Sequence, residues 1–153
     1  MELYDLITNE VLVISVCAWV VAQLIKVFAG LAREKSLDLR YLIASGDMPS
    51  AHTALVCALA TATAITQGFN SATFAITAIL AMVVMYDAAG VRRSVSKQSI
   101  IINRIVKEVR ISHPKGEIEH DLREFIGHTP FQVIVGAVLG ILIAWLWLTI
   151  SVL

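Results

Sequence analysis

Residues 44–66 read ASGDMPSAHTALVCALATATAIT, and they change from a polar turn to an apolar helix within a few positions. Pro49 suits the first turn of a helix, and Ser50 suits its N-terminal cap. His52 then stands at the start of a largely apolar segment. Placing an ionisable side chain in a membrane costs free energy, and such residues usually have a functional role. The stretch therefore predicts a membrane-embedded helix with a functional site at its beginning.

The composition of the whole chain predicts an integral membrane protein. Of its 153 residues, 58% are hydrophobic and 16% are charged, against about 25% charged residues in an ordinary soluble domain. The length suits a single membrane-embedded domain covering residues 1–153. The formal net charge is zero, which gives no support to a nucleic-acid partner. The opening MELYDLITNE has no basic residue, so we expect no cleavable signal peptide.

Four segments approach the roughly 20 apolar residues that cross a bilayer. They are residues 11–29, 49–66, 72–89 and 130–153. The short sequence QGFNSA joins the second segment to the third and predicts an antiparallel hairpin. We therefore expect an all-α integral membrane protein with four transmembrane helices.

Two polar segments connect these spans, at residues 30–48 and 90–129. Within residues 94–110, the apolar side chains recur at helical spacing, which suits a helix lying in the membrane interface. Residues 117–127, EIEHDLREFIG, have a similar pattern. One or two interfacial amphipathic helices should therefore accompany the four spans.

The basic residues predict the topology. All 12 Lys and Arg lie on or beside the two polar segments, and four spans place both segments on one side. Because cytoplasmic segments carry the excess of Lys and Arg, we expect these segments in the cytoplasm and both termini outside. In a bacterium, the membrane would be the plasma membrane.

Two histidines stand at the starts of spans that begin on this predicted cytoplasmic side. His52 follows MPSA, and His128 precedes TPF, where Thr129 suits a cap and Pro130 a first helical residue. A helix N-terminus offers unpaired N–H groups and a partial positive charge, which suits an anion. Basic residues accompany both ends in the sequence, namely Lys26, Arg33, Arg92, Arg93, Lys97 and Arg123. The pattern predicts a phosphate pocket at a membrane surface.

These motifs resemble the type 2 phosphatidic acid phosphatase family, which also includes vanadium haloperoxidases. MPSAH resembles the family's P-S-G-H signature, and Lys26 and Arg33 have the K-x6-R spacing of its first motif. GHTPFQVIVGAVLG, from residue 127, resembles the third motif and the glycine-containing helix after it. The resemblance is closest to a divergent branch that shares MYDAAGVRR and GHTP.

The resemblance implies a chemistry without metal or cofactor. His128 would be the nucleophile and His52 the general acid. Phosphoryl oxygens would be held by Lys26, Arg33, Ser50 and the backbone N–H of Ala51. The implied substrate is a lipid phosphate or diphosphate in the surrounding membrane lipid.

This chain departs from the family pattern at several positions. Ala51 replaces a glycine, and Arg123 lies one residue closer to His128 than the family's arginine, so Arg92 or Arg93 is an alternative. Gln132 stands where the family has the aspartate that orients the nucleophile. Asp87 is the candidate to replace that carboxylate, and its alternative role is to neutralise a neighbouring arginine.

Three functional hypotheses follow. The first is a lipid phosphate phosphatase acting at the cytoplasmic face through a phosphohistidine. The second is a catalytically weak relative that binds or moves a phospholipid or isoprenoid phosphate, and a purely structural membrane subunit is a third. The histidines could also be simple polar caps, and the basic residues of 92–110 a surface facing phospholipid. A homo-oligomer is expected, with Gly136 and Gly140 as a candidate contact.

Overall fold

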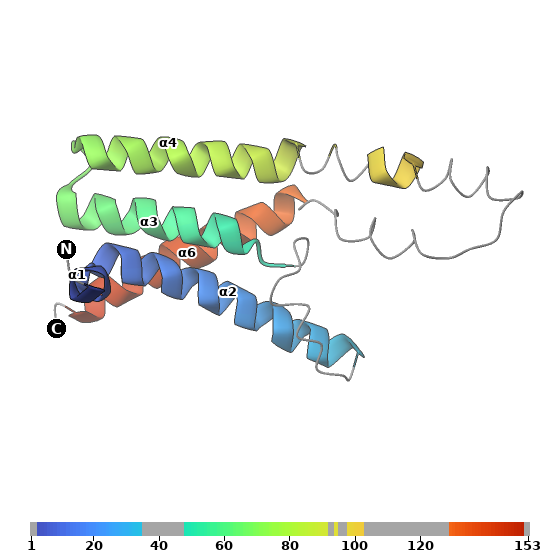
Figure 1. Ribbon diagram of the computed structural model, residues 1–153, viewed down its shortest axis with the longest axis horizontal. Helices are drawn as coiled ribbons and strands as arrows, with labels where there is room; N and C mark the ends of the chain where they lie inside the picture. The colour runs from blue at the N-terminus through green and yellow to red at the C-terminus, as the bar shows by residue number, and fades with distance from the viewer. Residues whose placement is uncertain (1–2, 35–47, 92–93, 95–97, 103–128, 152–153) are drawn as a thin grey trace, which may run out of the picture.

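The computed structural model describes residues 3–34, 48–91, 94, 98–102 and 129–151. Four long helices run alongside one another in alternating directions (Figure 1). They are α2 (Glu10–Glu34), α3 (Ala51–Gln67), α4 (Ala72–Tyr86) and α6 (Pro130–Ser151). A short helix, α1 (Leu3–Thr8), precedes them, and a π-helical turn, η2 (Asp87–Val91), continues α4. The elements of the described residues are therefore all helical, as expected.

The first predicted span is longer in the structure than in the sequence reading. Helix α2 has 25 residues and reaches Glu34, beyond the expected end at residue 29. Its start is fixed by Asn9, whose Oδ1 accepts the backbone N–H of Leu12 at 3.1 Å. This cap also separates α2 from α1, a helix that the sequence reading did not include.

Helix α3 is the central element of the bundle. It packs against α2, α4 and α6, and most of its small side chains are buried. The helix begins at Ala51 rather than at Pro49, because Ser50 has extended backbone and caps the first turn. Pro49 therefore precedes the cap, and its expected place in the first helical turn is wrong.

Within the described residues, three helical stretches are long and apolar enough to cross a membrane. They are Glu10–Ala32 in α2, Ala72–Gly90, which joins α4 to η2, and Pro130–Ser151, which is α6. The 17 residues of α3 extend only about 25 Å at 1.5 Å per residue, against a hydrocarbon core of about 30 Å. Because α3 is enclosed by three neighbours, small residues that permit close packing replace the large apolar side chains of a lipid-facing helix. The fourth crossing stays a prediction.

The contact between α3 and α6 depends on two glycines. A Cβ at Gly136 would lie 2.5 Å from the carbonyl oxygen of Ser50, and one at Gly140 would collide with the carbonyl oxygen of Ala54. These glycines therefore form a packing face, but they use it within the chain. The expectation that they contact a second copy is wrong, while a homo-oligomer formed through another face stays a prediction.

The tight turn between α3 and α4 confirms the predicted hairpin. Gly68 has φ +86°, a conformation that favours glycine, and its N–H bonds the carbonyl of Ala64 at 3.0 Å. Ser71 then caps α4 through the N–H of Phe74 at 3.1 Å. This turn and both chain termini lie at one end of the bundle (Figure 1).

The polar segments are described only in small part. Residues 98–102 are helical, and Ile100, Ile101 and Ile102 are exposed, while the interfacial position of this segment stays a prediction. The rest of the first predicted amphipathic helix is described only at residue 94, and the second predicted helix lies outside the described residues.

Candidate active site at two helix N-termini

The beginnings of α3 and α6 are in direct contact. The backbone N–H of Ser50 donates to the backbone carbonyl of Gln132 at 3.2 Å. Gly136, one turn further along α6, packs against Ser50 and Thr53. The two helix ends that the sequence reading singled out therefore lie side by side, and their partial positive charges reinforce each other.

Ser50 is wholly buried and serves as the cap of α3. Its Oγ accepts the hydroxyl of Thr53 at 2.9 Å and the backbone N–H of Thr53 at 3.4 Å. Ala51 is also buried, whereas His52, the second residue of the helix, is exposed. The structure therefore presents the imidazole at the surface of the site and keeps the serine beneath it.

Gln132 takes part in a reciprocal cap at the start of α6. Its Oε1 accepts the backbone N–H of Thr129 at 2.7 Å, while its own N–H approaches the Oγ1 of Thr129 at 3.4 Å. This is the capping box of a Thr-x-x-Gln sequence. The sequence predicts Thr129 as the cap, whereas the capping role of Gln132 was not predicted; the Thr-x-x-Gln spacing in TPFQ is the signal for it.

Lys26 is 3% exposed although it lies well inside α2. One turn before it, Ala22 packs against Ala51 and Ala54 of α3. Since α2 and α3 run in opposite directions (Figure 1), Lys26 lies about 6 Å further along α2, level with the capped end of α3. The structure thus brings the predicted basic residue to the predicted helix end.

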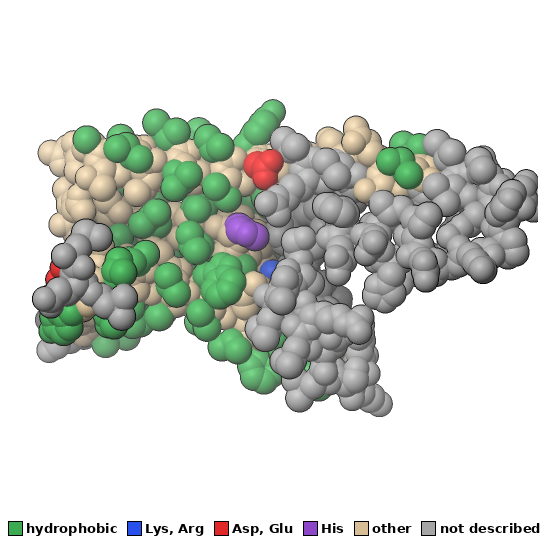
Figure 2. Space-filling model, viewed as in Figure 1, with side chains coloured by type: hydrophobic (Ala, Val, Ile, Leu, Met, Phe, Trp, Pro, Cys, Tyr) green, Lys and Arg blue, Asp and Glu red, His purple; other side chains and the backbone are tan. Residues whose placement is uncertain are grey.

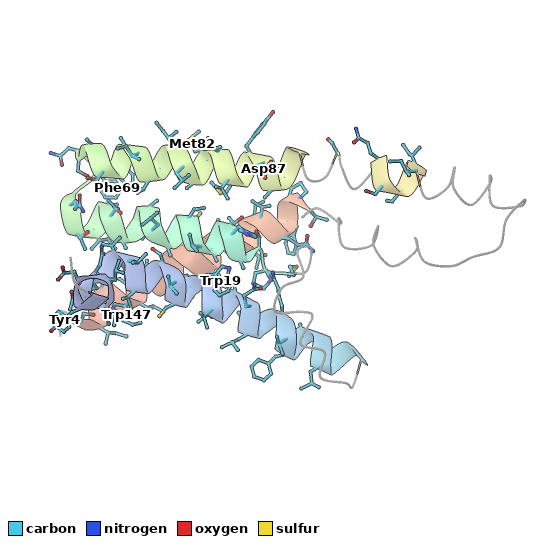
Figure 3. The ribbon with its side chains drawn as sticks, viewed as in Figure 1. Tyr4, Trp19, Phe69, Met82, Asp87 and Trp147 are labelled. Carbon is cyan, nitrogen blue, oxygen red and sulfur yellow. The ribbon has the colours of Figure 1, made fainter. Side chains whose placement is uncertain are left out.

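Asp87 lies at the junction of α4 and η2, where its N–H bonds the carbonyls of Val83 and Val84. Figure 3 labels Asp87 at this end of α4, and η2 packs against α6. On the face in Figure 2, a histidine, an acidic side chain and part of a Lys or Arg side chain lie close together, where the described helices meet the grey residues. A π-helical turn is uncommon and often occurs at a functional site.

The structure does not describe the side chains of the remaining predicted site residues. Arg33 lies in the last turn of α2, but the structure does not describe its side chain. Outside the described residues lie Arg92, Arg93, Arg123 and His128. His128 is nevertheless joined by a peptide bond to Thr129, whose N–H is held by Gln132.

Neither cysteine belongs to the site. Cys17 and Cys57 are free thiols, and Cys57 is buried with its Sγ 3.8 Å from the Sδ of Met85. Among the described residues, no group of three or more His, Cys, Asp or Glu side chains is arranged to hold a metal ion.

Comparison with known proteins gives the family. The model of the Divergent PAP2 family matches residues 7–143, which include all of α3, the larger part of α6, and His52 and His128. Over 149 residues, the chain is 38% identical to the uncharacterized membrane protein YuiD of Bacillus subtilis (strain 168), covering 91% of this chain and 94% of that protein. No solved structure matches the chain. The protein is thus an integral membrane protein that belongs to the Divergent PAP2 family.

Proposed function

We propose that this protein is a lipid phosphate phosphatase that acts at the cytoplasmic face through a phosphohistidine on His128. The observation that carries the proposal is the 3.2 Å hydrogen bond from the N–H of Ser50 to the carbonyl of Gln132. It joins the start of α3, which carries His52, to the start of α6, which His128 precedes by two residues. Membership of the family supports a role related to phosphoryl chemistry.

The reaction proceeds in two steps. A ring nitrogen of His128 attacks phosphorus, and the P–O bond to the lipid breaks as the P–N bond forms. The imidazolium of His52 gives its proton to the leaving oxygen, which departs as an alcohol or, from a diphosphate, as a monophosphate. Water then attacks the phosphohistidine, neutral His52 takes the proton of that water, and inorganic phosphate leaves. His128 is restored, and no metal or cofactor takes part.

The charges around the helix ends suit this reaction. The ammonium group of Lys26 and the N-termini of α3 and α6 have the same sign, so together they favour an anion and the charge that develops in the transition state. Arg33 and one of Arg92, Arg93 and Arg123 complete the phosphate site. Asp87, carried beside α6 by η2, replaces the family's aspartate and orients His128.

A binding protein is the second candidate, and one observation favours it. The position at which the family pattern has an aspartate holds Gln132, whose Oε1 accepts the N–H of Thr129. A neutral amide engaged in a helix cap supplies no charge to stabilise an imidazolium. Without a carboxylate from Asp87, the same pocket would bind a lipid phosphate and turn it over very slowly.

Hydrolysis by the purified full chain, without added divalent metal and in the presence of EDTA, tests the proposal. We expect release of phosphate from a lipid monophosphate or diphosphate, inhibition by vanadate, and loss of activity in His128→Ala. The matched control is His120→Ala, which removes a histidine to which no role is assigned and should remain active.

Two further results discriminate between the candidates. His52→Ala should spare a substrate with a good leaving group more than an alkyl ester, because only the latter requires the proton. Acid-labile, alkali-stable phosphate should be trapped on wild-type protein and not on His128→Ala. If the wild type is no more active than His128→Ala, and both bind lipid phosphates equally, the phosphatase is excluded and the binding protein takes its place.

A further inference from the structure

Helix α3 is covered on three of its sides. Toward α2, Ala58 and Ala62 pack with Ile14 and Ala18. Toward α4, Val56 and Cys57 pack with Ala81. Toward α6, the two glycines lie against Ser50 and Ala54. Within the described part of the chain, α2 and α4 share no extended contact, so the side of α3 opposite α6 lies open between them.

Three residues occupy this open side, which we call the open strip of α3: His52, Leu55 and Leu59. Their i, i+3, i+7 spacing places them on one helical face. His52 is exposed and the two leucines are half-buried, whereas Ala58, Ala62, Val56 and Cys57 beside them are buried. Leu55 borders the strip, because it also packs against the cluster toward α4. Figure 2 looks onto this side and shows a histidine exposed among hydrophobic side chains.

The open strip is polar at one end and apolar along the rest. At the polar end lie His52, the capped N-terminus of α3 and, on the neighbouring helix, the buried Lys26. From there the two leucines lead about 10 Å along the helix, at 1.5 Å per residue. This arrangement suits a single lipid molecule whose anionic headgroup lies at the helix end and whose hydrocarbon chain lies along the leucines.

We propose that the open strip holds the first part of the hydrocarbon chain of a lipid phosphate whose phosphate lies at the start of α3. The inference rests on the proposed function for the identity of the ligand, but it needs no hydrolysis. It explains why His52 faces the gap between α2 and α4: a lipid enters sideways from the bilayer without leaving it. It also makes the chain of the lipid part of what the protein recognises.

Photolabelling of the full chain in nanodiscs tests the proposal directly. The probe is a phosphatidic acid with a diazirine in its acyl chain, and the control probe is the matching diacylglycerol. We expect the phosphatidic acid to label the peptide containing Leu55 and Leu59 about tenfold more than the diacylglycerol does, because only the former is held by charge. Lys26→Met should remove that difference.

Variants then locate the chain on the strip. Leu59→Trp fills the strip and should suppress labelling of α3 and raise the KM for long-chain phosphates but not for a short-chain ester. The matched control is Met82→Trp, on the outer side of α4 (Figure 3), which should change neither.

Each contrary outcome has a distinct meaning. Equal labelling by the two probes would show that bulk lipid alone covers the strip, and it would overturn the inference even in an active enzyme. Efficient disulfide formation between two copies of Leu59→Cys, in a background with Cys17 and Cys57 replaced, would assign the strip to a dimer interface and overturn it as well. Selective labelling of an inactive protein would support the inference while the phosphatase fails.

Discussion

At the scale of single residues, Gln132 has two tasks that a single substitution can separate. Its backbone carbonyl joins α6 to the cap of α3, and its side chain holds the peptide group that links His128 to Thr129. The first task needs no particular side chain. The second needs an acceptor three residues after the cap with the reach of Gln or Glu.

We therefore expect Gln132→Glu to keep the capping box while placing a carboxylate beside the helix start. Its melting temperature in detergent should match that of the wild type, and its phosphatase turnover should rise if a missing negative charge limits the rate. Gln132→Leu, of similar size, should lose about 1 kcal/mol of stability and most of the activity. Gln132→Asp is one methylene shorter and should lose the contact with Thr129. A Leu variant as stable and as active as the wild type would contradict this role.

The sequence predicts both helix caps of this site, but it does not predict the burial of Lys26. Ser50 and Thr129 were identified as caps because each precedes a helix with a suitable side chain. The burial of Lys26 depends on Ala22 meeting Ala51 and Ala54, a contact between distant parts of the chain. The local sequence pattern carries no information about such a contact. It therefore predicts a position for Lys26 near the membrane surface, but not the burial of its side chain.

At the scale of the helices, the spans were predictable and their ends less so. Apolar composition located α2, α4 and α6, but the extension of α2 to Glu34 and the change to π-helix at Asp87 lie in polar or small-residue sequence. Helix α3, in contrast, is not recognised as a span by its length and apolar composition. Because three of its sides pack against other helices, close packing favours small residues in most of α3, and its 17 residues make it shorter than the three candidate spans.

The enclosure of α3 predicts a strong response to substitution of Gly140. In Gly140→Ala, the new methyl group meets the backbone carbonyl of Ala54, which can move only if α3 and α6 separate. We expect a loss of about 1–3 kcal/mol, seen as a lower melting temperature in detergent, together with reduced activity because the two helix starts move apart. Gly90→Ala is the matched control, since its Cβ would meet nothing within 4 Å. Equal stability of the two variants would argue against the close α3–α6 contact.

At the scale of the whole molecule, the ribbon has two different ends. One end carries both termini and the turn from Gly68 to Ser71, and the candidate site lies at the other (Figure 1). All 12 Lys and Arg lie on or beside the two segments that connect the helices at the site end. If all four long helices cross the bilayer, this distribution places the site in the cytoplasm and both termini outside.

Labelling of single cysteines with an impermeant reagent in intact cells measures this orientation. Cys17 and Cys57 are first replaced by alanine, since both are free thiols. Asn70→Cys lies in the turn between α3 and α4, at the end with the termini, and should be labelled from outside. Glu117→Cys, which lies outside the described residues, belongs to the basic connecting segment and should be labelled only after the cells are opened.

Labelling of position 117 but not of position 70 in intact cells would reverse the orientation, and the proposed phosphatase would then act on lipids of the outer leaflet. Labelling of both would mean that α4 does not separate them, so the four-span arrangement itself would have to be abandoned.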